Sequence, residues 1–297
     1  MKPQRVLAVC ADDFGLAPGI SAGIARLARA GRLTTVSCLT NGAHWPAGAP
    51  LLQGLPATVD VGLHLNFTEG RPLSPVLAKL WPQFPSLPVL IARAHLGALP
   101  RGALRNEAHA QLAAFIHARG AAPAFVDGHQ HVHHLPGLRA IILDMVEHVQ
   151  PLPAVRSTGR LLGPGFAVKR WLIERTGGRA LADELARRRI AHNPALLGAY
   201  DFADPDYRAL MQGWLAALPA EGGLLFCHPA DAPTAEAPTP GIPSDTAPDN
   251  TPDTASDTAP DPIAAARRRE SAYLGSAAFA QDLAAANVRL GRVWRTG

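Results

Sequence analysis

Short apolar runs typical of buried strands alternate with helical patterns along most of this 297-residue chain. The first run is Arg5 to Ala11, and Gly19 to Ala30 follows it with Ile20, Ile24 and Leu27 on one helical face. Further strands are expected at 34–39, 59–67, 124–126, 154–156, 223–227 and 288–294, further helices at 103–119, 138–149, 167–175, 179–190, 205–218 and 266–287, and a proline-rich loop at 71–100. This alternation predicts an α/β fold with a parallel sheet.

Polar side chains gather where these strands end. They are Asp12, Asp13, Asn41, His64, Asp127, His129, Arg156 and His228. Because active sites of (β/α) barrels and open α/β sheets form at the carboxyl ends of the strands, we expect these side chains on one rim. The number of helices between strands is irregular, so the expected fold is a single-domain deformed (β/α) barrel with parallel strands.

Residues 232–262 interrupt this pattern. The segment contains five Asp, one Glu, eight Pro and no Lys or Arg, so its formal charge is −6. Since the whole chain has a formal net charge of +4, the remaining residues together carry +10. Such a composition cannot bury enough apolar surface to offset the entropy of ordering, which predicts a disordered acidic insertion. Residues 1–231 and 263–297 then form one catalytic barrel domain. The insertion is either merely tolerated or docks a partner.

Charge and hydropathy exclude several classes of protein. The arginine triplets at 187–189 and 267–269 lie in helical patterns without interleaved aromatic residues, so we interpret both as solvated faces and expect no nucleic-acid partner. No apolar run reaches the length of about 18 residues that a membrane span needs. Three cysteines without a CxxC pair, and an N-terminus without a signal-peptide pattern, indicate reduced thiols and a cytoplasmic location.

Four histidines fall within the six-residue run HQHVHH, from His129 to His134. Such a run is either a surface segment or a set of metal ligands. It directly follows the buried-strand pattern Phe125-Val126-Asp127, which favours a position of the first histidine close to the core. Neutral imidazole is the commonest metal ligand, so the cluster predicts metal binding.

Asp12 and Asp13 form an adjacent acid pair at the end of the first strand. One interpretation is local, because an Asp can cap the helix that begins near Pro18. The other is chemical. Neighbouring side chains on an extended chain point in different directions, so one carboxylate can bind a metal while the other faces bound water as a base.

His64 and His228 are each compatible with an ordinary core histidine, since leucines flank His64 and Pro229 ends the strand after His228. Together with the acid pair, however, they complete the residues of a hydrolytic centre. One Asp and two His can hold a divalent metal with open positions, and a second carboxylate can take a proton from water. A histidine on the opposite side can protonate a leaving amine.

Five segments carry a resemblance to a known family. They are ADDFGLAPGI (11–20), TTVSCLTNG (34–42), VGLHLNFTEGRPL (61–73), FVDGHQHVHHLP (125–136) and FCHPAD (226–231). In this order and spacing, the chain resembles the YdjC-like carbohydrate deacetylases, the family that includes chitooligosaccharide deacetylase. The resemblance implies a deformed (β/α) barrel that hydrolyses the N-acetyl group of an N-acetylated amino sugar or oligosaccharide and releases acetate.

The same resemblance implies roles for individual residues. It implies that Asp13, His64 and His129 are the ligands of one divalent metal ion, Mg²⁺ or Zn²⁺. It also implies that Asp12 is the general base and His228 the general acid. Asp127 is implied as the carboxylate that orients one of the imidazoles. It assigns no substrate-binding residues.

The chain departs from the family pattern at two places. The acidic segment separates His228 from the stretch Arg267-Arg268-Arg269-Glu270, and Gln130 stands where some relatives have a further histidine. Two other functions stay open: a metal-dependent hydrolase of another ester or phosphoester, and a non-catalytic sugar-binding protein. The expected partner is an N-acetylated sugar, and a homo-oligomer is compatible with the sequence.

Overall fold

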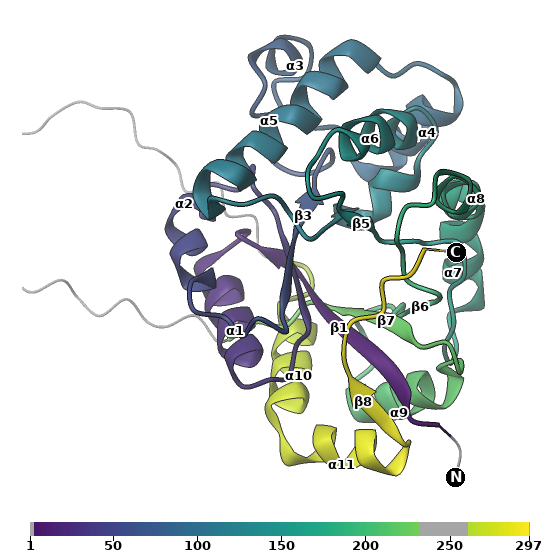
Figure 1. Ribbon diagram of the computed structural model, residues 1–297. Coiled ribbons are helices and arrows are strands. Elements are labelled where there is room, and N and C mark those ends of the chain that lie inside the picture. The colour runs from purple at the N-terminus through teal and green to yellow at the C-terminus, as the bar shows by residue number, and fades with distance from the viewer. Residues whose placement is uncertain (1–2, 232–260, 297) are drawn as a thin grey trace, which may run out of the picture.

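The structure, a computed structural model, describes residues 3–231 and 261–296. Its centre is a curled sheet of parallel strands in the order β5-β4-β3-β2-β1-β7-β6, with β8 also paired to β1 (Figure 1). The strands are β1 (Arg5–Phe14), β2 (Thr35–Cys38), β3 (Asp60–Leu65), β4 (Phe125–Gly128), β5 (Ala154–Val155), β6 (Leu196–Leu197), β7 (Gly223–Cys227) and β8 (Val288–Leu290). Residues 232–260 of the expected insertion lie outside the described residues, so its disorder stays a prediction.

Strand β1 lies at the centre of the sheet, and its residues 7–14 are all buried. Strand β7 pairs with it from Leu7 to Ala11, and β2 pairs with its carboxyl end. Strand β8 pairs with the first three residues of β1. The chain after the insertion therefore returns to the same sheet as the N-terminal segment.

The two edges of the sheet are joined by isolated bridges. Val155 in β5 bridges His192, and Leu161 bridges Leu196 in β6. The sheet thus curls into an irregular barrel. This arrangement confirms the expected deformed (β/α) barrel.

Helices lie around the outside of the sheet, with α1 and α10 packed side by side (Figure 1). The helices and helical turns are α1 (Pro18–Arg29), α2 (Trp45–Gly48), η1 (Ala49–Leu52), α3 (Pro75–Leu80), α4 (Leu87–His95), α5 (Arg101–Arg119), η2 (His129–His134), α6 (Leu138–Glu147), α7 (Ala167–Ile173), η3 (Glu174–Gly178), α8 (Arg179–Arg188), α9 (Tyr207–Ala217), α10 (Ala264–Gly275) and α11 (Ala277–Ala285). Helix α1 and the helices from α5 to α11 lie where the sequence pattern predicts them, and the pattern at 266–287 is divided between α10 and α11.

Two parts of the chain differ from the sequence prediction. The expected loop at 71–100 contains α3 and α4, because Pro75 and Pro88 stand in the first turns of these helices, where no intrahelical N–H bond is lost. Strand β6 was not predicted, since two residues are too few to show a periodic pattern.

The two arginine triplets differ in burial. Arg187 is exposed and pairs with Glu184 at 2.8 Å, as expected of a solvated face. Arg267 is instead only 3% exposed and forms an ion pair with Asp13. The interpretation of the second triplet as a solvated face was therefore wrong at Arg267, because the carboxylate that allows its burial is remote in sequence.

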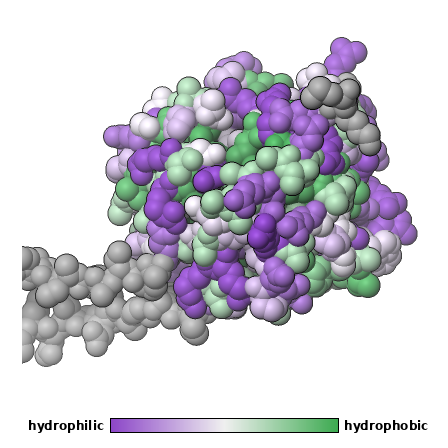
Figure 2. Space-filling model, turned by 90° about the horizontal axis from the view of Figure 1, so that it is seen from below, coloured by the Kyte–Doolittle hydropathy of each residue, from purple (hydrophilic) through white to green (hydrophobic). Residues whose placement is uncertain are grey.

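The surface mixes polar and apolar side chains. On the face shown in Figure 2, hydrophilic and hydrophobic residues are interspersed. Exposed large apolar residues include Val168, Trp171 and Leu172 of α7. Among the described helices, none combines the length and the hydropathy that crossing a bilayer requires.

Candidate active site

The end of β1 is irregular and separates the side chains of Asp12 and Asp13. The register of β1 against β2 shifts between Ala11 and Phe14, and Asp13 has a φ of 69°, in the left-handed region. That conformation is uncommon for a residue other than Gly and often marks a functional site. As a result, Asp12 contacts Arg156, whereas Asp13 contacts two histidines.

Asp13, His64 and His129 come together at the carboxyl ends of β1, β3 and β4. Asp13 Oδ1 lies 3.0 Å from His129 Nδ1 and 3.5 Å from His64 Nε2. One ligand atom from each of these buried residues lies within 4.8 Å of the other two. Tetrahedral ligands about 2.1 Å from a zinc ion lie about 3.4 Å apart, so the three side chains fit a divalent cation.

His64 is held on the side that faces away from Asp13. Its Nδ1 lies 2.7 Å from Asp127 Oδ1 and 3.0 Å from Ser37 Oγ, and the Ser37 hydroxyl also donates to Asp127 at 2.5 Å. A carboxylate on one imidazole nitrogen directs the other nitrogen to a metal. Asp127 therefore lies at the position from which it can orient an imidazole.

The acids around the two histidines change the charge of the site. Burial lowers the pKa of His64, but the charge of Asp127 and further acid contacts raise it to about 10. Burial likewise opposes protonation of His129, but Asp13 and Glu69 raise the pKa of that imidazole to about 9. Burial opposes ionisation of Asp13, yet His129 holds its pKa well below the usual value. Without a cation, both imidazoles are therefore protonated on both nitrogens and positively charged at neutral pH.

Asp12 belongs to a second buried cluster, next to the first. Arg156 Nη1 lies 2.7 Å from Asp12 Oδ2, and Arg156 Nη2 lies 2.6 Å from Asp12 Oδ1 and 2.5 Å from Asp127 Oδ2. The same guanidinium donates to Cys10 Sγ at 3.0 Å. Cys10, Asp12 and Asp127 are close enough to hold a cation, but Arg156 already supplies the positive charge there.

His228 follows β7 and packs edge-on against Phe202 and Phe226, with ring centroids 5.2 and 5.7 Å apart. Its Nδ1 is buried and has no hydrogen-bond partner among the described residues. Burial lowers the pKa of His228 to about 4, although the charges of Asp13 and Asp12 oppose this shift. The ring is therefore uncharged at neutral pH and has a nitrogen free to take a proton.

The HQHVHH run forms the turn η2, and its rings point to different partners. Gln130 and His131 have φ angles of 51° and 62°, so the backbone turns away after His129. His133 Nε2 donates to the backbone carbonyl of Arg156 at 2.8 Å, and His134 Nδ1 lies 2.8 Å from the hydroxyl of Thr158. Of the four histidines in this run, His129 is the one that lies in the group with Asp13 and His64 that could hold a metal ion.

Sequence reasoning gave no role to two charged residues that touch the cluster. Arg267 Nη2 donates to Asp13 Oδ2 at 2.8 Å, and Glu69 Oε1 lies 3.1 Å from His129 Nε2. Glu69 belongs to the same VGLHLNFTEGRPL segment as His64. This shared segment is the one sequence signal that could have indicated a role for Glu69. No local signal indicates Arg267.

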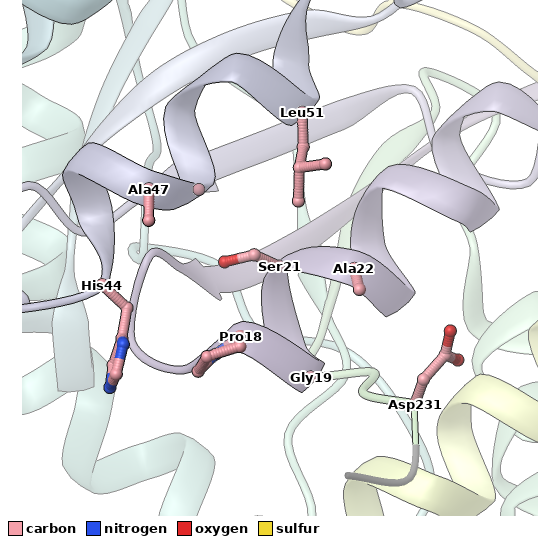
Figure 3. Close-up of a pocket in the computed structure, with 9 residues that line it drawn as sticks. Pro18, Gly19, Ser21, Ala22, His44, Ala47, Leu51 and Asp231 are labelled. Carbon is pink, nitrogen blue, oxygen red and sulfur yellow. The ribbon is translucent and has the colours of Figure 1, made fainter. Parts of the chain in front are cut away.

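A separate cavity of about 280 Å³ lies between α1 and the turn formed by α2 and η1 (Figure 3). Its walls are formed by Pro18, Gly19, Ser21, Ala22, His44, Ala47, Gly48, Leu51 and Asp231. No predicted site residue lines it. The cavity is therefore distinct from the cluster around Asp13.

Known proteins share this sequence pattern. The profile of the family described as YdjC-like protein matches residues 6–285. Over 154 residues the chain is 37% identical to a carbohydrate deacetylase of Homo sapiens, covering 49% of this chain and 46% of that protein. Over 150 residues it is 34% identical to a chitooligosaccharide deacetylase of Yersinia enterocolitica, covering 50% and 58%.

The chain thus spans about half the length of the curated relatives it matches. A crystal structure of an Enterococcus faecalis protein, provisionally assigned to cellobiose-phosphate cleavage, aligns over 98% of both chains with a TM-score of 0.69 and 18% identity. At this identity the likeness concerns the fold alone. Since the family profile covers nearly the whole sequence, the chain belongs to the YdjC-like protein family.

Proposed function

We propose that this protein is a metal-dependent carbohydrate N-deacetylase, a hydrolase that removes the acetyl group from an N-acetylated amino sugar or oligosaccharide. The observation that carries the proposal is the convergence of Asp13, His64 and His129 beside a further buried carboxylate, Asp12. The names of the human and Yersinia relatives support this substrate class.

The proposal also includes the organisation and location of the protein. Residues 1–231 and 263–297 form one catalytic domain, supported by the pairing of β8 with β1. The location is cytoplasmic, supported by three buried cysteines that form no disulfide.

Asp13, His64 and His129 would hold the divalent cation, Zn²⁺ or Mg²⁺. One carboxylate oxygen and two imidazole nitrogens suit zinc and accept other divalent ions. When bound, the cation supplies polarisation of the acetyl carbonyl and lowers the pKa of a water molecule at an open position. Asp127, on Nδ1 of His64, keeps Nε2 of that ring directed to the cation site.

Asp12 is the general base in this proposal, and His228 is the general acid. Arg156 bonds both oxygens of Asp12, which fixes the carboxylate in one orientation. A carboxylate fixed in this way accepts the proton of the attacking water without first reorienting. As the C–N bond of the acetamide breaks, its nitrogen needs a proton. His228, uncharged at neutral pH, would take up through its free Nδ1 a proton that balances the one Asp12 accepts from water, and would pass it to the amine.

Acetate release tests the proposed function. The substrates are N-acetylglucosamine and chitin disaccharide, assayed with zinc- and magnesium-loaded protein beside a panel of carboxylate esters and phosphoesters. We expect acetate release that stops when EDTA removes the metal. Turnover of the esters or phosphoesters alone would establish another hydrolase instead. Sugar binding without turnover would establish the non-catalytic alternative.

Replacing the base separates catalysis from metal binding. Asp12→Asn is expected to lower kcat by about 10²- to 10⁴-fold, because a general base contributes that much. Zinc affinity, measured by calorimetry, is expected to stay nearly unchanged, because Asp12 contacts Arg156 rather than the three metal-binding residues. Asp183→Asn, at an exposed position of α8, is the matched control. Wild-type turnover in Asp12→Asn would remove the role of Asp12 as base.

A further inference from the structure

Helix α10 places two buried polar side chains, the carboxyl group of Glu270 and the guanidinium of Arg267, against the peptide groups of His228. Glu270 Oε2 accepts a hydrogen bond from the backbone N–H of His228. Arg267, one helical turn earlier, donates from Nη1 to the backbone carbonyl of His228 at 3.4 Å. Glu270 is completely buried, and Arg267 is 3% exposed. The backbone of His228 is thus held from both sides by one helix.

Arg267 also connects His228 to the metal-binding cluster. Its Nη2 donates to Asp13 Oδ2 at 2.8 Å, while the other oxygen of Asp13 faces the two histidines. Its Nε donates to Asp261 at 2.7 Å, which anchors the guanidinium from the far side. One side chain therefore fixes the end of β1 relative to the end of β7.

Glu270 is held as firmly as Arg267. The hydroxyl of Tyr200 donates to Glu270 Oε1 at 2.5 Å, so both carboxylate oxygens have partners. Replacing buried ionic groups by apolar residues of similar volume is often neutral or stabilising. A buried arginine and glutamate next to His228 are therefore compatible with a role in holding the site as well as with a role in stability.

We propose that Arg267 and Glu270 are positioning residues of the deacetylation, which fix His228 relative to Asp13. The proposal rests on the proposed function, in which His228 delivers a proton to the leaving amine. Neither residue needs to touch the substrate. Both act by holding the backbone that carries the imidazole, and Arg267 also holds Asp13.

A double-mutant cycle with His228 tests whether the two residues act through it. Glu270→Gln and Arg267→Lys are each expected to lower kcat by about 10- to 100-fold, with KM within about threefold, since displacement of a catalytic group by about 1 Å has effects of this size. In a His228→Ala background, Glu270→Gln is expected to change kcat by less than about twofold, and Arg267→Lys to lose most of its effect. Arg268→Lys, at the neighbouring exposed position, is the matched control and leaves kcat unchanged.

A second measurement does not depend on turnover. The backbone amide proton of His228, bonded to a buried carboxylate, is expected to resonate far downfield in the NMR spectrum and to move upfield in Glu270→Gln. If Glu270→Gln does not fold, Tyr200→Phe removes the other hydrogen bond to Glu270 and enters the same cycle, with a smaller effect of the same pattern.

The outcomes distinguish the two proposals. An unshifted His228 amide, or effects fully additive with His228→Ala, would overturn the positioning role and leave the deacetylase proposal standing. Wild-type protein that releases no acetate from any N-acetylated sugar overturns both. A shifted amide with non-additive losses of kcat supports both.

Discussion

Arg156 supports two parts of the site with one buried charge. Its guanidinium contacts the carboxylates of Asp12 and Asp127 and the thiol of Cys10. Burial opposes ionisation of Asp127, but Arg156 and His64 lower its pKa to about 2. Asp127 therefore stays ionised and accepts the hydrogen bond that orients His64. The same arginine fixes the carboxylate of Asp12.

Removing this charge destabilises the protein strongly. Arg156→Met leaves two buried carboxylates without their cation, so we expect the free energy of unfolding to fall by about 3–5 kcal/mol. Urea denaturation followed by circular dichroism measures the change. Arg187→Met breaks an exposed ion pair and is the control, with an expected loss of about 0–1 kcal/mol. Equal losses in the two variants would contradict the importance assigned to the buried cluster.

At the residue scale, the sequence predicts the site only where motifs are local. Asp13 and His129 each follow a strand pattern and His64 lies within one, and the resemblance to a known family names the three as one ligand set. The sequence pattern predicted that Arg156 lies at the carboxyl end of a strand. It could not predict the ion pair with Asp12, because Asp12 lies 144 positions away in the sequence. Arg267 lies 254 positions from Asp13, and within its triplet nothing distinguishes it from its exposed neighbour.

At the scale of elements, α5 fixes the loop that follows β3. Glu107 accepts hydrogen bonds from the backbone N–H groups of residues 73–74 at 3.1 and 2.7 Å. Gln111 bonds both the N–H and the carbonyl of Asn66, whose side chain accepts the N–H of Glu69 at 3.1 Å. The helix thereby places the loop that carries Glu69 to the edge of the site.

Removing the carboxylate of Glu107 tests this support. Glu107→Ala leaves backbone N–H groups without partners, each costing about 1–3 kcal/mol when buried. We expect the free energy of unfolding to fall by about 2–4 kcal/mol in urea denaturation. Asn106→Ala, at the adjacent exposed position of α5, is expected to change it by no more than about 0.5 kcal/mol. Coincident unfolding curves for the two variants would show that the loop is held by other contacts.

Elements with a strong period could be predicted, and short or proline-rich ones could not. Residues 101–119 show helical spacing over several turns, so α5 was expected. The prolines at 75 and 88 favoured a loop, although each is compatible with the first turn of a helix. The different partners of the later histidines of the HQHVHH run depend on the left-handed backbone at Gln130 and His131, which no sequence pattern predicted.

At the scale of the whole molecule, curling of the sheet brings acids and imidazoles from three strands together, and this couples the proposed metal binding to pH. In the metal-free protein the pKa values of His64 and His129 are about 10 and about 9, because neighbouring carboxylates outweigh the effect of burial. A cation must therefore displace a proton from each ring. Affinity rises as the pH rises toward 9 to 10 and falls as the rings become fully protonated.

This coupling predicts that zinc binding at pH 7 releases up to two protons per cation. Calorimetric titrations in buffers of different ionisation enthalpy measure that number. His129→Gln removes one titrating ring, so it is expected to release one proton fewer and to bind zinc more weakly. Zinc binding without proton release at pH 7 would show that the metal uses other ligands.

The way in which the barrel closes links its integrity to the chemistry at its rim. The edges are joined by the bridges at Val155 and Leu161, and Arg156, the residue after Val155, reaches from that seam to carboxylates at the ends of β1 and β4. Amide hydrogens along such a seam exchange with solvent through local openings that leave the central strands intact. Because Arg156 links this seam to the carboxylates of the candidate site, we expect that neutralising those charges loosens the seam.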